Sequence, residues 1–211
     1  FSGPALAGTT GSHGNEEPPG VGSLQLVLRS AAYRLVHAGQ EVRIEMDGFG
    51  FLEQPGRAML PERESLVLLP PGARVRSLEV EPLGTRELPG KYRVVPTPRL
   101  LALSSMTGPP EVRERQEAEW SEAHRAAYAD DGAYPGEVAR IVGSGTLRKY
   151  SYVRVAFRPF SYPAASGRLI HHPRARIRVH YTTPEISEAE ARQAELLRLD
   201  TVADERAARL F

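Results

Sequence analysis

Two runs of alternating side chains limit the folds open to this 211-residue chain more than any other feature. Residues 150–157 read Tyr-Ser-Tyr-Val-Arg-Val-Ala-Phe, and residues 175–181 read Ala-Arg-Ile-Arg-Val-His-Tyr. Alternation with a period of two is typical of a strand that has one buried and one solvent-facing side. The Pro, Ser and Gly residues of segment 158–168 predict a loop between the two strands. We therefore expect a long hairpin or a Greek-key crossover in an antiparallel sheet.

Short strands separated by turns fill much of the remaining sequence. Eighteen Pro and nineteen Gly residues suit a chain with many turns, and residues 49–61 read as a Gly/Pro loop. Further strands are expected at residues 23–29, 33–37, 40–46, 66–69, 75–81 and 92–95, with a hairpin within 33–46 and a possible β-bulge within 75–81. This spacing of short strands indicates an all-β fold, an antiparallel β-sandwich of the jelly-roll type.

The two ends of the chain differ in composition from the part between them. Residues 1–22 are rich in Gly, Pro, Ser and Thr and have almost no large apolar side chains, so we expect a disordered leader. Ser187 and Glu190 fit a helix capping box, which predicts a helical tail over residues 184–211. The β-sandwich domain is expected to span residues 23–183.

Composition excludes several classes of protein. Apolar residues make up 41% of the chain, and no run approaches the length of a membrane-spanning helix. The net charge of +1, from 27 basic and 26 acidic residues, indicates no nucleic-acid partner. The chain has no Cys, which excludes thiol catalysis, disulfides and thiolate metal sites. It begins with Phe1 rather than Met, which fits either processing on export or simple trimming.

The sequence lacks the motifs of an enzyme. None of its six histidines has the spacing of a zinc-protease motif, and His171 and His172 are expected in a surface turn. Asp130, Asp131 and Gly132 resemble the start of a calcium loop, but the remaining acidic positions are missing, so a solvated turn is expected. Neither a phosphate-binding Gly loop nor a Gly-x-Ser-x-Gly elbow occurs. We predict a non-catalytic protein with no metal and no cofactor.

An ordered set of motifs covers residues 54–181. They are Gly56-Arg-Ala-Met-Leu-Pro61, Leu66-Val-Leu-Leu-Pro-Pro-Gly-Ala-Arg-Val75, Tyr134-Pro-Gly136, Gly145-Thr-Leu-Arg148, Val155-x-x-x-Pro159-Phe-x-Tyr162-x-x-x-x-Gly167-x-Leu169 and Ile177-x-Val-x-Tyr181. The set resembles the pro-domain of the gingipain family of cysteine proteases.

This resemblance implies a pro-domain that keeps a cysteine protease latent and assists its folding. In that family a loop of the pro-domain enters the primary specificity pocket of the protease with a basic residue. The charged, helix-permissive segment 111–128, which contains Trp120, offers the candidates Arg113, Arg115 and Arg125. Their position between Pro110 and the Tyr134 motif favours Arg113 or Arg115. A solvated charged helix is the alternative interpretation of this segment.

The resemblance also implies a partner and a location. The partner would be the catalytic domain of the cognate cysteine protease, in the same precursor and downstream of Phe211. Arg206 and Arg209 are candidate cleavage sites for maturation, although Arg residues also suit an ordinary helix end. The protein would be secreted, extracellular or periplasmic, in a bacterium.

Two other functions remain open on the sequence. A stand-alone extracellular β-sandwich that binds carbohydrate or protein would be expected to expose aromatic residues on one face. The aromatic candidates, which also fit core positions, are Tyr152, Phe157, Phe160, Tyr162 and Tyr181. The third possibility is a subunit linked to secretion that stays bound to its cleaved partner.

Overall fold

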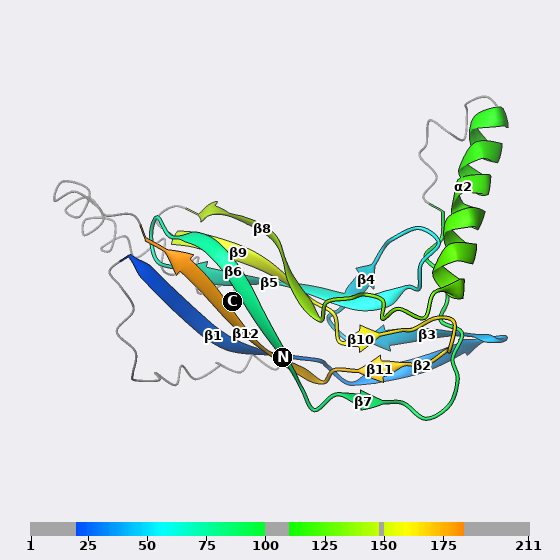
Figure 1. The fold of residues 1–211 in the computed structure, drawn as a ribbon, viewed down its shortest axis with the longest axis horizontal. Coiled ribbons are helices and arrows are strands. Elements are labelled where there is room, and N and C mark those ends of the chain that lie inside the picture. The colour runs from blue at the N-terminus through cyan, green and yellow to red at the C-terminus, as the bar shows by residue number, and fades with distance from the viewer. Residues whose placement is uncertain (1–19, 100–109, 148–149, 184–211) are drawn as a thin grey trace.

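The computed structural model describes residues 20–99, 110–147 and 150–183. Within them the chain forms several antiparallel sheets and one helix, α2 (Pro110–Ala129), as Figure 1 shows. The strands are β1 Val21–Arg29, β2 Tyr33–Ala38, β3 Glu41–Met46, β4 Gly50–Leu52, β5 Leu60–Leu69, β6 Arg74–Leu83, β7 Arg86–Glu87, β8 Ala139–Leu147, β9 Tyr150–Phe157, β10 Phe160–Ser161, β11 Ile170–His171 and β12 Arg174–Thr182. The all-β, sandwich-like fold expected from the alternating runs is confirmed.

Two sheets pack face to face to form the larger part of the fold. One has the strand order β1-β12-β6 and the other β4-β5-β9-β8 (Figure 1). Their inner faces enclose what we call the first core, whose buried members are Leu28, Val67, Leu69, Ala73, Ala139, Val153, Val155, Phe157, Ala175, Ile177 and Val179. The inward residues of both alternating runs are thus buried, because period-two alternation places them on one side of a strand.

A second core lies next to the sandwich, beneath the β2–β3 hairpin and the small β10-β11-β7 sheet. Its buried members are Val42, Ile44, Met46, Ala58, Leu60, Val94, Phe160, Tyr162 and Leu169. Three of these, Phe160, Tyr162 and Leu169, come from the longest of the sequence motifs. That motif therefore contributes three large buried side chains to the second core.

The two cores share strands and a buried ion pair. Strand β5 places Leu60 in the second core and Val67 in the first. Arg158, which follows β9, donates from Nε to Glu62 Oε2 of β5 at 2.6 Å, and the two side chains are only 6% and 17% exposed. A buried guanidinium needs such a partner, because an unpaired buried charge is strongly destabilising.

Segment 158–168 is a crossover and not a hairpin loop. Strands β9 and β12, which flank it, lie in different sheets. The predicted hairpin over residues 33–46 is confirmed as β2 and β3. The predicted bulge is confirmed as well, since Ser77 pairs with His180 and Val75 with Tyr181, leaving Arg76 as the extra residue.

Other boundaries differ from the sequence predictions. The expected loop 49–61 contains β4 and the start of β5, and the expected strand 92–95 forms only isolated bridges, such as Val94 with Val42. Strand β1 begins at Val21, two residues before its predicted start.

Strand β8 was missed because it contains Gly143 and Gly145, which lower strand propensity. The Tyr152 hydroxyl lies only 2.7 Å from where a side chain on Gly145 would begin. Strand β9 therefore fills the space that the glycine leaves open.

The predicted tail, with Arg206 and Arg209, and residues 1–19 of the predicted leader lie outside the described residues. Within the described part, no helix is long and apolar enough to cross a membrane.

Replacing Ile177 tests the first core. Ile177 is fully buried between the two sheets, so Ile177→Ala should lower the free energy of unfolding by about 3 kcal/mol in a denaturant titration. The neighbouring Arg176→Ala removes an exposed side chain that pairs with Glu81 and should cost less than about 1 kcal/mol. Equal losses for both variants would contradict the assigned strand faces.

Candidate functional site

Helix α2 stands away from the sheets as a twenty-residue surface element (Figure 1). The predicted helical character of segment 111–128 is confirmed, with Pro110 at the first position, which suits its fixed backbone angle. None of its residues is fully buried. A helix of this kind gains little from apolar burial, so its position depends on specific attachments.

The attachments lie on one stripe of the helix. Its half-buried residues include a series with a spacing of four, namely Val112, Gln116, Trp120, His124 and Tyr128. Residues four apart share one helix face. The Trp120 and His124 rings stack nearly parallel with centroids 5.2 Å apart, and the His124 and Tyr128 ring centroids are 4.4 Å apart.

Three side chains of this stripe donate hydrogen bonds to backbone carbonyls below the helix. The bonds run from Trp120 Nε1 to Thr97 O at 3.0 Å, from His124 Nδ1 to Gly56 O at 3.3 Å, and from the Tyr128 hydroxyl to Val94 O. Because a carbonyl only accepts, His124 carries its proton on Nδ1. Gly56 has a φ of +79°, and a side chain there would begin 2.8 Å from the His124 backbone N. Only glycine fits this contact.

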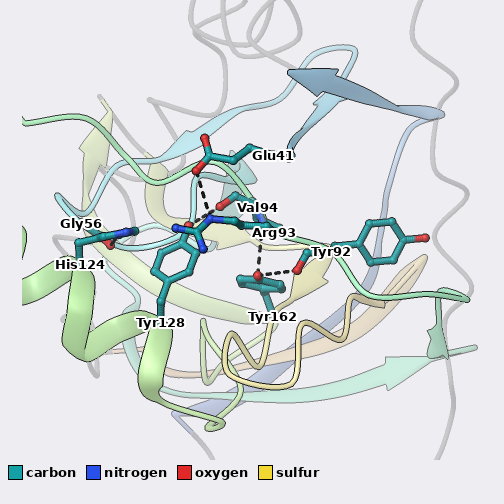
Figure 2. Close-up of polar contacts among 8 residues, drawn as sticks. All are labelled: Glu41, Gly56, Tyr92, Arg93, Val94, His124, Tyr128 and Tyr162. Carbon is teal, nitrogen blue, oxygen red and sulfur yellow. Dashed lines mark hydrogen bonds and ion pairs between the residues drawn. The ribbon is translucent and has the colours of Figure 1, made fainter. Parts of the chain in front are cut away.

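Tyr162 fixes the backbone on which α2 rests (Figure 2). Its hydroxyl donates to Tyr92 O at 2.8 Å and accepts from Val94 N at 3.3 Å. The carbonyl of the same Val94 accepts the bond from Tyr128. The motif residue Tyr162 thus holds Val94, and Val94 in turn binds Tyr128 of α2.

The Tyr128 hydroxyl is held protonated at this contact. Burial raises the pKa of Tyr128 well above its usual value, and nearby Tyr162 and Glu41 add to the effect, while Arg93 opposes it. The Arg93 guanidinium lies 5.7 Å from the centre of the Tyr128 ring and pairs with Glu41 at 3.4 Å. Tyr128 therefore remains a hydrogen-bond donor across the physiological pH range.

The three predicted inhibitory residues all lie exposed on α2, but the structure does not bring them together. Arg113 and Arg115 are two positions apart and so point to different sides of the helix. Arg115 Nε lies 3.9 Å from Glu119, and both side chains are 70% exposed. Arg125 lies in the C-terminal half of the helix.

The three candidates lie on a helix and not on a loop, because residues 110–129 are helical throughout. Their inhibitory role stays a prediction. A helix satisfies its backbone groups internally. Only the side chains of Arg113, Arg115 and Arg125 remain available to enter a pocket.

Sequence reasoning singled out Trp120 but missed His124 and Tyr128 as attachments. The spacing of four residues from Trp120 indicates only that the three side chains share one face of a helix. Hydrogen bonds to distant carbonyls leave no trace in the local sequence.

The expectation that His171 and His172 lie in a surface turn is wrong. They are 3% and 8% exposed. The His172 ring contacts Thr85 Oγ1 at 2.9 Å and Ser161 Oγ at 3.0 Å. The packing of β7, β10 and β11 buries the pair, and sequence periodicity does not reveal such tertiary packing.

His171 is held neutral. Arg86 donates to its Nδ1 at 3.4 Å, so its proton is on Nε2, which donates to Ser30 Oγ at 3.1 Å. Burial, assisted by Arg86 and His172, lowers the pKa of His171 to about 4. Burial also lowers the pKa of His172.

The acidic turn at residues 130–132 is solvent-exposed, as expected. The Ser166 side chain, together with the Ser166 backbone N–H that donates to Asp131 at 3.0 Å, holds the pKa of Asp131 below its usual value. Within the described residues, no group of three His, Cys, Asp or Glu side chains is placed to hold a metal ion.

Comparison with solved structures finds the same fold in two gingipain structures. One match is the "Complex of Porphyromonas gingivalis RgpB pro- and mature domains", at 15% identity over 79% of this chain and 84% of that chain, with a TM-score of 0.56. Another is gingipain K from Porphyromonas gingivalis, in a structure concerned with its zymogenic latency, at 17% identity over 77% and 88% of the chains, with a TM-score of 0.50. The sequence matches no protein-family model and no curated protein. The resemblance to gingipain pro-domains is thus confirmed for the fold.

Removing the Tyr128 hydroxyl tests the attachment of α2. Tyr128→Phe leaves the Val94 carbonyl without this donor and should cost about 1–2 kcal/mol. Hydrogen exchange should quicken in α2 while the first core stays protected. Tyr152→Phe, on the outer face of β9, is the matched control. Unchanged exchange in α2 would show that the other contacts suffice to hold the helix.

Acid should destabilise the fold through His171. The unfolded chain binds a proton near the ordinary pKa of 6.5, and the folded chain only near 4. The contribution of neutral His171 to the free energy of unfolding is therefore complete above about pH 6.5, and it falls by about 3 kcal/mol as the pH drops to 4. His171→Gln should reduce this slope in denaturant titrations across the pH range, with His37→Gln as the exposed control. An unchanged slope in His171→Gln would contradict the assignment.

Proposed function

We propose that this chain is the non-catalytic pro-domain of a gingipain-like cysteine protease and keeps that protease latent. The observation that carries the proposal is the fold shared with the RgpB pro- and mature-domain complex and the gingipain K zymogen structure, over more than three quarters of this chain. The ordered motifs of residues 54–181 support it independently. The partner is the catalytic domain of the same precursor, exported from the cell, and Arg206 and Arg209 are sites of maturation cleavage.

Helix α2 is the proposed contact with the protease. It projects from the sheets (Figure 1) and carries exposed Arg side chains. Trp120, His124 and Tyr128 attach its other side to the domain. A side chain presented on a fixed support loses less conformational freedom on binding than one on a mobile loop. The scaffold therefore favours a tight contact through few residues.

The proposed mechanism is occupation of the active-site cleft by one Arg side chain. A guanidinium pairs bidentately with a carboxylate, as a pocket specific for basic residues would require. Since the backbone of α2 is helical, it cannot lie in the cleft as an extended substrate does. The side chain alone blocks the pocket, and the absence of a bound scissile bond protects the pro-domain from cleavage there.

The carbohydrate-binding alternative is not favoured. It predicts exposed aromatic residues on one face, whereas the exposed large apolar residues in the described part are aliphatic: Val27, Val36, Leu66 and Leu147. Phe157, Phe160 and Tyr162, which were candidates for such a face, belong to the two cores.

Inhibition of the catalytic domain by the added chain tests the proposal. Arg113→Ala combined with Arg115→Ala, and Arg125→Ala separately, should identify the anchor. Its loss should weaken inhibition tens-fold or more, since an anchor of this kind is worth roughly 2–4 kcal/mol. The inhibition constant against a peptide substrate is the measurement. Arg154→Ala, an exposed arginine on β9 that pairs with Glu64, is the matched control.

The possible outcomes separate the two parts of the proposal. No inhibition by the unaltered chain would exclude the latency function. Inhibition that survives all three α2 substitutions would retain the function but exclude these arginines from the mechanism.

A further inference from the structure

Strand β1 is an edge strand of the larger sandwich. Among the residues that the structure describes, it is bonded only to β12 in the sheet β1-β12-β6. Its register with β12 is unbroken from Val21 opposite Thr182 to Arg29 opposite Arg174. A long regular edge offers a row of unpaired backbone groups to another strand.

The backbone groups that point to the open side can be assigned. At the two ends of β1, Thr183 donates to Gly20 O at 2.8 Å and Ser30 donates to Pro173 O at 2.9 Å. In an antiparallel pair, alternate residues bond to the same neighbour. The even-numbered residues of β1 therefore bond to β12. The backbone N–H and C=O groups that face outward are those of Val21, Ser23, Gln25, Val27 and Arg29.

This edge lacks the usual protection against strand pairing. Residues 21–28 include no charged residue and no proline, and the single charged residue of β1, Arg29, is its last residue. The edge strands on the other side of the sandwich do carry such features: β6 contains Arg74, Arg76, Glu79, Glu81 and Pro82, and β8 contains Arg140 and a register shift between Ile141 and Gly143. Charges, prolines and bulges are the features that block edge-to-edge pairing.

The apolar surface beside β1 is also incompletely covered. Leu24 and Leu26 lie on the inner face but are only half-buried, whereas their cross-strand neighbours Val179 and Ile177 are fully buried. Val27, on the outer face, is 39% exposed. A further strand at this edge would cover both leucines.

We propose that β1 pairs antiparallel with β1 of a second copy of this chain, about a two-fold axis at Gln25. In this register Leu24 faces Leu26 of the second copy, and Ser23 faces Val27 of the second copy. The sequence is thus self-complementary, with apolar residues meeting on the inner face and no like charges opposed. An isologous contact of this kind closes as a dimer.

The dimer joins two three-stranded sheets into one continuous sheet. Strand β1 lies at the end of the molecule away from α2 (Figure 1). The proposed protease contact on α2 therefore stays accessible in the dimer. The dimer and the protease contact can be tested independently of each other.

Sedimentation equilibrium of the 211-residue chain over a range of concentrations tests the dimer. Ser23→Glu combined with Val27→Glu would place two pairs of carboxylates opposite one another and should weaken dimerisation about tenfold or more. The folded monomer should tolerate both changes, because basic His180 and Arg176 lie opposite these positions on β12. Circular dichroism checks folding of each variant.

A charge-swap experiment decides whether β1 itself forms the contact. Ser23→Lys combined with Val27→Lys sets ammonium groups opposite His180 and Arg176, so this variant is compared only once circular dichroism shows the unaltered fold. It should weaken self-association similarly, and mixing the folded acidic and basic variants should restore a dimer. Val36→Glu combined with Leu147→Glu, at exposed apolar residues of β2 and β8, is the control and should leave dimerisation unchanged.

Three results would overturn the proposal. These are a chain that remains monomeric at every concentration, a dimer unaffected by charges on β1, and variants that fail to pair when mixed. A monomer would also mean that any strand added at this edge belongs to the same chain or to a different protein.

Discussion

The hydroxyl of Tyr162 connects the core of this protein to its candidate functional surface. It donates to Tyr92 O and accepts from Val94 N, so both of its hydrogen-bonding roles are used. A buried hydroxyl without partners would be costly, and burial also raises the pKa of Tyr162, which keeps the donor proton in place. Because the Val94 carbonyl in turn accepts the hydrogen bond from Tyr128 of α2, Tyr162 fixes the acceptor of one of the three hydrogen bonds that attach the helix.

Helix α2 and the sandwich are stabilised in different ways. The first core buries complete apolar side chains from two sheets, which is the dominant favourable term in folding. The helix has no fully buried residue and is held by polar donors and stacked rings. Polar contacts to a few carbonyls are weaker than a core but more directional.

Alternation of apolar and polar residues correctly predicted the strands that have one buried and one solvent-exposed face. Strand β9 coincides with the predicted run, and the inward residues of β12 are the buried ones. Alternation failed at β8, where glycines make room for Tyr152. It also failed at His171 and His172, which are buried at the small β10-β11-β7 sheet. For the two histidines the deciding contacts came from residues distant in the sequence, namely Ser30, Thr85 and Arg86.

The sequence by itself determined the β-sandwich class, the hairpin, the β-bulge and the resemblance to gingipain pro-domains, and it showed that the composition of segment 111–128 permits a helix. Each follows from local periodicity or from ordered motifs. Tertiary structure alone decided that the flanking strands of segment 158–168 enter different sheets, that His171 is buried and neutral, and which face of α2 is attached. The reason is physical: periodicity fixes which side of an element is apolar, whereas its neighbour is chosen by packing across the whole chain.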